Sequence, residues 1–112
     1  METKQVIEAL SALAQDTRLS IYRLLVQRGP AGLGAGAIAE ALDIPASSLS
    51  FHLAHLSRAG LLTQRRESRS LIYAVDFTGM NALMGYLTEN CCGGDAAACA
   101  PALLAPCCDP AA

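Results

Sequence analysis

Long hydrophobic runs are missing from this chain of 112 residues. No apolar stretch approaches the roughly 20 residues that a membrane-spanning helix needs. The first residues, Met1–Gln5, also lack the basic stretch and apolar segment of a secretory signal. We therefore expect a soluble, cytoplasmic protein with no membrane partner. The length corresponds to about one domain, which argues against a multi-domain enzyme.

Cysteine is absent from residues 1–90 and concentrated near the end of the chain. The five cysteines are Cys91, Cys92, Cys99, Cys107 and Cys108. Cytosolic thiols stay mostly reduced, so this odd count favours metal binding or redox chemistry over a disulfide framework. Neither histidine lies near the cysteines in sequence to activate a nucleophile, so we do not expect an enzyme.

An excess of positive charge is also missing, since 8 basic residues face 10 acidic ones and the net charge is −2. That balance disfavours nucleic-acid binding, which needs cations for the phosphates. The basic residues are clustered, however, and Arg58, Arg65, Arg66 and Arg69 lie close together in sequence. The cluster fits either a DNA-contacting patch or a solvated charged turn.

Residues 3–90 carry a helical period of apolar residues, interrupted by one hairpin pattern. Helices are expected around residues 6–13, 16–28, 37–42, 47–59 and 77–87, and strands at residues 62–66 and 70–75. Asp16 is expected to cap the second helix, and Gly32, Gly34 and Gly36 to form a loose connection before the third. The residues expected to form the core face of the first two helices are Val6, Ile7, Leu10, Leu13, Leu19, Ile21, Leu24 and Leu25.

The expected last helix carries an apolar stripe that so small a domain has few residues left to cover. The stripe consists of Phe77, Met80, Leu83, Met84 and Leu87. We expect it to pair with a second subunit. The order of elements predicts a mainly α fold with a β-hairpin wing, a homodimeric winged helix-turn-helix.

The fourth expected helix has the features of a DNA-recognition helix. Ser47, Ser48 and Ser50 place small polar side chains at its start, where phosphates and base edges can be approached. Phe51 falls on the face opposite the leucines and either meets a thymine methyl group or packs at the edge of the core. His55 either reaches a phosphate or is a plain surface residue.

His52 lies beside the apolar stripe of the same helix and is expected to be structural. Arg58, at the end of this helix, lies on its DNA-facing side. The arginines of the hairpin, Arg65, Arg66 and Arg69, are expected to reach the DNA backbone or the minor groove.

Three segments of the chain look like the ArsR/SmtB repressors. They are residues 14–19 (AQDTRL), residues 50–62 (SFHLAHLSRAGLL) and the wing ending Leu71-Ile72-Tyr73. The resemblance covers nearly all of residues 5–90. It implies a homodimer with terminal helices at the interface, which binds a palindromic double-stranded operator and is released by a metal or metalloid.

Two metal sites used in that family have no counterpart here. Residues 33–38, before the turn, contain no cysteine, and the last expected helix contains no histidine. The segment with Cys91, Cys92 and Cys99 instead looks like the arsenic-responsive subgroup, whose arsenite site is a cysteine pair plus one later cysteine.

The chemistry of the cysteines agrees with that resemblance. Trivalent arsenic is soft and takes three thiolates. Adjacent cysteines on a continuous helix point about 100° apart, and Gly93-Gly94 would end the helix and let Cys99 fold back. Zinc prefers four ligands and commonly a Cys-x2-4-Cys spacing, which is missing. Cys107 and Cys108 could form a second site suited to methylated arsenic, or belong to a dispensable tail.

The sequence therefore predicts two parts: residues 1–92 as the DNA-binding and dimerisation domain, and residues 93–112 as a flexible, cysteine-rich tail that contributes to the metalloid site. The expected function is a repressor released by As(III) or Sb(III). The alternatives are a redox or persulfide sensor on the same fold, and a sensor of methylated arsenic or another soft metal.

Overall fold

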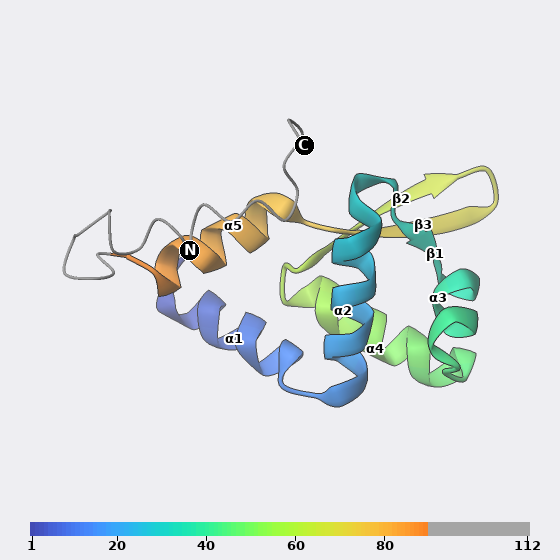
Figure 1. Ribbon diagram of the computed structural model, residues 1–112, viewed down its shortest axis with the longest axis horizontal. Helices are drawn as coiled ribbons and strands as arrows, with labels where there is room; N and C mark the ends of the chain where they lie inside the picture. Colours follow the sequence, from blue (N-terminus) through green and yellow to red (C-terminus); the bar gives the residue numbers. More distant parts are fainter. Residues whose placement is uncertain (90–112) are drawn as a thin grey trace.

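The computed structural model describes residues 1–89, shown in colour in Figure 1. The helices of this part are α1 (Thr3–Leu13), α2 (Asp16–Arg28), α3 (Ala35–Leu42), α4 (Ala46–Arg58) and α5 (Phe77–Leu87). The strands are β1 (Leu33–Gly34), β2 (Leu62–Glu67) and β3 (Ser70–Val75), and a 3-10 turn, η1 (Gly29–Ala31), follows α2. The predicted fold class is confirmed: a mainly helical winged helix-turn-helix with an antiparallel wing.

The wing is a three-stranded antiparallel sheet in the order β1-β3-β2. The pair Glu67↔Ser70 closes the hairpin, so that Ser68 and Arg69 form its turn and Ser68 adopts a φ of 55°. β1 pairs with the other end of β3, through Leu33↔Tyr73 and Gly34↔Ile72. The sheet thus joins the connection after α2 to the hairpin.

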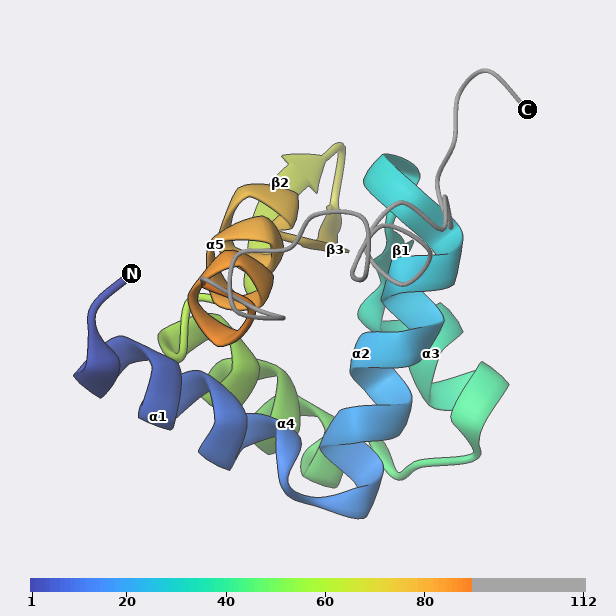
Figure 2. The same cartoon turned by 60° about the vertical axis from the view of Figure 1, so that its left-hand side comes forward.

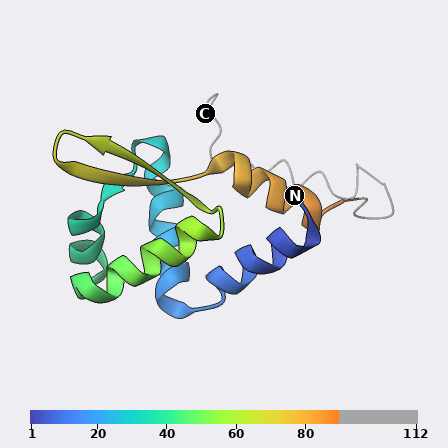
Figure 3. The same cartoon turned by 180° about the vertical axis from the view of Figure 1, so that it is seen from behind.

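The core lies where α2 and α4 cross, and views from opposite sides show the crossing (Figures 1 and 3). α1 and α5 lie on one side of α2, and α3 and the wing lie on the other (Figure 1). The largest fully buried side chains are Ile21, Leu25, Ile38, Leu49, Leu53, Leu56 and Leu61. Burial of these branched side chains supplies the main stabilisation of the fold.

Several local expectations are wrong. Gln15, rather than Asp16, caps α2, because its side-chain oxygen accepts a hydrogen bond from the backbone N–H of Arg18 at 2.9 Å. Leu19 is 43% exposed, although it was expected in the core. In α1 the buried residues are Val6, Ala9 and Ala12, whereas the predicted core residues Ile7 and Leu10 are exposed.

The glycine-rich connection before α3 is ordered rather than loose. Gly34 belongs to β1, and Gly36 lies within α3, which begins two residues earlier than expected. Gly32 has a φ of +67°, and a Cβ placed on it would lie 2.4 Å from the carbonyl oxygen of Tyr73. Only glycine fits this close approach without displacing backbone.

Candidate nucleic-acid interface

The recognition helix α4 has one buried face and one exposed face, as its sequence predicts. Leu49, Leu53 and Leu56 are at most 1% exposed and hold the helix against the core. Ser47, Ser48 and Ser50 are exposed near its N-terminus. The helix dipole makes this end electropositive, so its serines and backbone N–H groups suit contact with a phosphate.

Phe51 lies on the exposed face of α4 and is 62% exposed. Its ring makes edge-to-face contacts with His52 and His55, with centroid separations of 5.8 and 6.4 Å. The alternative in which Phe51 packs at the edge of the core is therefore wrong for the described chain. The exposed ring of Phe51, which packs against the two histidines, is accessible to an apolar group on a partner.

His52 is held by a residue that the sequence reasoning overlooked. Arg18 Nη1 lies 3.4 Å from His52 Nδ1, and Arg18 Nε donates to the carbonyl oxygen of Ala12 at 2.7 Å. Burial lowers the pKa of His52 below its ordinary value, and the charge of Arg18 and the neighbouring His55 lower it further. The expectation that His52 is structural agrees with this arrangement.

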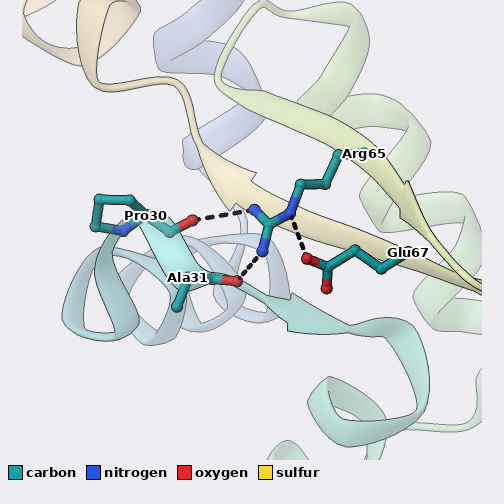
Figure 4. A network of polar contacts seen from close by, with 4 residues as sticks. All are labelled: Pro30, Ala31, Arg65 and Glu67. Carbon is teal, nitrogen blue, oxygen red and sulfur yellow. Dashed lines mark hydrogen bonds and ion pairs between the residues drawn. The ribbon is translucent and has the colours of Figure 1, made fainter.

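The three wing arginines are exposed but differ in their surroundings. Arg65 Nη1 and Nη2 donate to the carbonyl oxygens of Pro30 and Ala31 at 3.1 and 2.7 Å, and its Nε lies 3.2 Å from Glu67 Oε1 (Figure 4). On the other side of β2, Gln64 Nε2 donates to Ser57 Oγ of α4 at 3.2 Å. The wing is therefore tied both to η1 and to the recognition helix.

Comparisons with known proteins agree with this geometry. A family model described as "Helix-turn-helix domain" matches residues 13–65. The transcriptional activator HlyU of Vibrio cholerae is 31% identical over 88 residues, 79% of each chain. The structure of reduced HlyU has a TM-score of 0.63 and 30% identity, over 80% of this chain and 92% of that chain.

Two further solved structures are similar. Mb0332 of Mycobacterium bovis, a homodimeric winged helix-turn-helix domain described as a possible ArsR-family regulator, is 31% identical with a TM-score of 0.62, over 78% of this chain and 81% of that chain. The chain belongs to the ArsR/SmtB family of DNA-binding transcriptional regulators. A possible regulator for arsenical resistance is 28% identical with a TM-score of 0.61, over 71% of this chain and 80% of that chain.

Membership of the ArsR/SmtB family confirms the expectation of a regulator rather than an enzyme. Within residues 1–89, no helix is long and apolar enough to cross a membrane. His55 and Arg58 of this regulator line a hollow of about 270 Å³ between α1 and α4, together with Ile7, Glu8, Ser11 and Ala59. These two predicted DNA contacts thus lie at the end of α4 nearest α1.

The predicted metalloid ligands of this ArsR-family chain, Cys91, Cys92 and Cys99, lie outside the described residues, as do Cys107 and Cys108. Within residues 1–89, no three His, Cys, Asp or Glu side chains come together as a possible metal site. The part of the chain that the structure describes therefore offers a surface for DNA, and the thiols all follow it in sequence.

Proposed function

We propose that this protein is a cytoplasmic repressor that binds a palindromic operator as a homodimer and leaves it when As(III) or Sb(III) binds. The observation that carries the inducer assignment is the position of the cysteines. Cys91 and Cys92 follow α5 by only a few residues, and residues 1–89 contain no thiol. The similar protein described as a possible regulator for arsenical resistance supports the same inducer class.

The exposed face of α4 and the wing support operator binding. Serine side chains at the start of α4 can approach phosphates and base edges, and Phe51 offers an apolar contact for a thymine methyl group. Arg58 of α4 and Arg66 and Arg69 of the wing supply exposed positive charge. They are three of the eight basic residues of a chain whose net charge is −2.

An uncovered apolar surface on α1 and α5 supports the dimer. Ile7 of α1 is 58% exposed, and Met84 and Leu87 of α5 are 50% and 52% exposed. Thr3 Oγ1 and Tyr86 Oη share a hydrogen bond of 2.7 Å, so the two helices are held together (Figure 2). Exposed large apolar side chains of this kind are typical of a subunit interface, and the similar Mb0332 domain is homodimeric.

Release of DNA requires the inducer to prefer a dimer that does not fit the operator. A hundredfold loss of operator affinity corresponds to about 2.7 kcal/mol of coupling between the two sites. Cys91 is only four residues after the end of α5 in sequence, so a metalloid bound by the cysteines would act on the helix that carries the proposed dimer surface. A change in the spacing of the two α4 helices would follow from a shift at that interface.

The test is a titration of operator binding with As(III). A chain truncated after Ala100, which keeps Cys91, Cys92 and Cys99, should still leave its operator. Cys91→Ser, Cys92→Ser and Cys99→Ser should each stay bound, because serine offers a hard, protonated oxygen in place of a thiolate. Operator affinity without As(III) is the control and should hardly change. A truncated protein that ignores As(III), or a normal response of Cys99→Ser, would exclude the three-thiolate site.

A redox or persulfide sensor on the same fold is the second candidate, and the similarity to HlyU, solved in a reduced form, favours it. Any disulfide in this chain must join cysteines of residues 91–108, because residues 1–90 contain none. An oxidant or a persulfide donor, without metalloid, would then release the operator, and dithiothreitol would restore binding. Release by As(III) under fully reducing conditions would favour the metalloid sensor.

A further inference from the structure

The guanidinium of Arg65 is occupied by other parts of the same chain. It bridges the carbonyl oxygens of Pro30 and Ala31 and pairs with Glu67, so Nε, Nη1 and Nη2 all have an acceptor within 3.2 Å (Figure 4). The two backbone carbonyls are 34 and 35 residues away in sequence. A side chain engaged in this way must break internal hydrogen bonds before it can contact a phosphate.

The carbonyls that Arg65 binds are held in place by the backbone around them. Gly29 and Gly32, on either side of Pro30 and Ala31, have φ values of +74° and +67°. Gly32 lies directly against the carbonyl of Tyr73 in β3, and the next residue, Leu33, pairs with Tyr73. Pro30 also fixes its own φ. The acceptors therefore form a rigid support at the end of α2.

Strand geometry separates Arg65 from Arg66. Successive side chains of a strand point to opposite faces, and the contacts of β2 follow this rule. Arg65 faces η1 while Gln64 bonds to Ser57 of α4, so Arg66 shares the face of Gln64. Within residues 1–89, Arg66 has no side-chain hydrogen bond or ion pair, and it is exposed. Arg66 is thus available to DNA without loss of internal contacts.

We propose that Arg65 is a positioning residue, which fixes the angle of the wing relative to α2, and that Arg66 and Arg69 make the phosphate contacts of the wing. The effect of this role on DNA affinity rests on the proposed operator binding, whereas its effect on the structure of the wing does not. A wing held in place before binding loses less conformational freedom when DNA binds. Lysine cannot replace Arg65, because a single ammonium group lacks the planar fork that reaches two carbonyls.

The first test needs no DNA. Amide hydrogen exchange of residues 62–75 should become faster in Arg65→Ala and Arg65→Lys, by about tenfold if local opening becomes easier by about 1.4 kcal/mol. Arg66→Ala is the matched control on the neighbouring position, and its wing should exchange as in the wild type. Unchanged exchange in both Arg65 variants, with the helical circular dichroism intact, would overturn the positioning role.

The second test is the salt dependence of operator binding. Arg65→Ala and Arg65→Lys should weaken binding equally, by about threefold to tenfold, with the slope of log K against log salt unchanged. Arg66→Ala should reduce that slope by about one, as expected for one lost phosphate contact. If Arg65→Lys binds like the wild type while Arg65→Ala loses one unit of slope, Arg65 is a phosphate contact and the proposal fails.

The two proposals fail in different ways. If the wild-type protein binds no operator at any salt concentration, operator binding is wrong, and the hydrogen-exchange comparison still decides the role of Arg65. If the wild type binds and the wing exchanges at the same rate in all variants, only the positioning role is lost.

Discussion

Arg18 joins the end of the first helix to the recognition helix, since its Nε bonds to the Ala12 carbonyl and its Nη1 approaches His52 Nδ1. Arginine only donates hydrogen bonds, so His52 Nδ1 must be the acceptor, and the neutral ring carries its proton on Nε2. Protonation of His52 removes this acceptor and places a second positive charge beside Arg18. The contact therefore exists only while His52 is neutral.

This relationship predicts how stability depends on pH. The pKa of folded His52 is lowered from 6.5, so the unfolded chain binds the proton first as the pH falls. The stabilisation is present above about pH 6.5 and is lost as the pH falls through the lower folded pKa. In urea unfolding between about pH 7.5 and 5, the wild type should lose more stability than His52→Asn, whose side-chain oxygen can still accept from Arg18.

His52→Leu is the companion variant, because it removes the acceptor at every pH. It should be less stable than His52→Asn at neutral pH, where the wild type keeps its contact. Equal pH dependence in wild type and His52→Asn would show that His52 contributes nothing to the acid sensitivity.

Tyr22 carries a buried hydroxyl group that has no hydrogen-bond partner within residues 1–89. Burial raises the pKa of Tyr22 to about 12, and the carboxylate of Asp76 adds to the effect. Tyr22→Phe removes a polar atom that makes no hydrogen bond, so stability at neutral pH should be unchanged or higher. Tyr22→Ala is the packing control and should cost about 3 kcal/mol or more in urea unfolding.

The raised pKa of Tyr22 also has a consequence at alkaline pH. Its contribution to stability is present below about pH 10 and is lost as the pH rises toward 12. Tyr22→Phe should lack this part of the alkaline destabilisation. A loss of more than about 1 kcal/mol in Tyr22→Phe at neutral pH would mean that the hydroxyl has a hydrogen-bond partner in solution.

Phe51 should contribute to the choice of DNA sequence rather than to folding. Because its side chain is 62% exposed, Phe51→Ala should leave the melting temperature almost unchanged. Specific operator affinity should fall by about 1 kcal/mol or more if the ring meets a thymine methyl group, while non-specific affinity falls less. Fluorescence anisotropy with operator and random DNA measures both, and equal losses on the two DNAs would exclude a base contact.

The apolar surface of α1 and α5 should control the oligomeric state. Met84→Glu and Leu87→Glu place a charge on the proposed interface and should shift the protein toward monomers in sedimentation velocity. Leu19→Glu is the matched control, since Leu19 is also an exposed leucine, at 43%, but lies on α2. A wild type that sediments as a monomer, or an equal effect of Leu19→Glu, would contradict this interface.

The sequence predicts well what depends on local periodicity. The helical spacing of the leucines in α4 and the two strands of the hairpin are visible in the sequence, and the structure has these elements almost where they are expected. Leu19 could also have been assigned correctly, because it is two residues from Ile21 and therefore about 200° away around the helix. In α1 the large apolar residues were predicted to form the core face. The small residues Ala9 and Ala12 are buried instead, and Ile7 is exposed.

Contacts between distant segments were not accessible from the sequence. β1 contains only two residues and exists because Leu33 pairs with Tyr73. Two partners of Arg65 are backbone carbonyls, which have no sequence signature, and the third is the carboxylate of Glu67. The sequence alone therefore does not distinguish Arg65 from the other wing arginines as a DNA contact. The signal that separates Arg65 from Arg66 is the alternation of faces along β2, and it becomes informative only when the neighbours of each face are known.

The last buried core residue of the described chain, Leu83, precedes the first cysteine by eight positions. Every buried core side chain of residues 1–89 therefore precedes the first candidate inducer ligand in sequence. The proposed inducer site then predicts that altering residues 90–112 changes the inducer while the described core keeps its sequence. The described DNA-binding domain can then be joined to other ligand-binding segments. The variable to engineer is the number of residues between α5 and the first ligand.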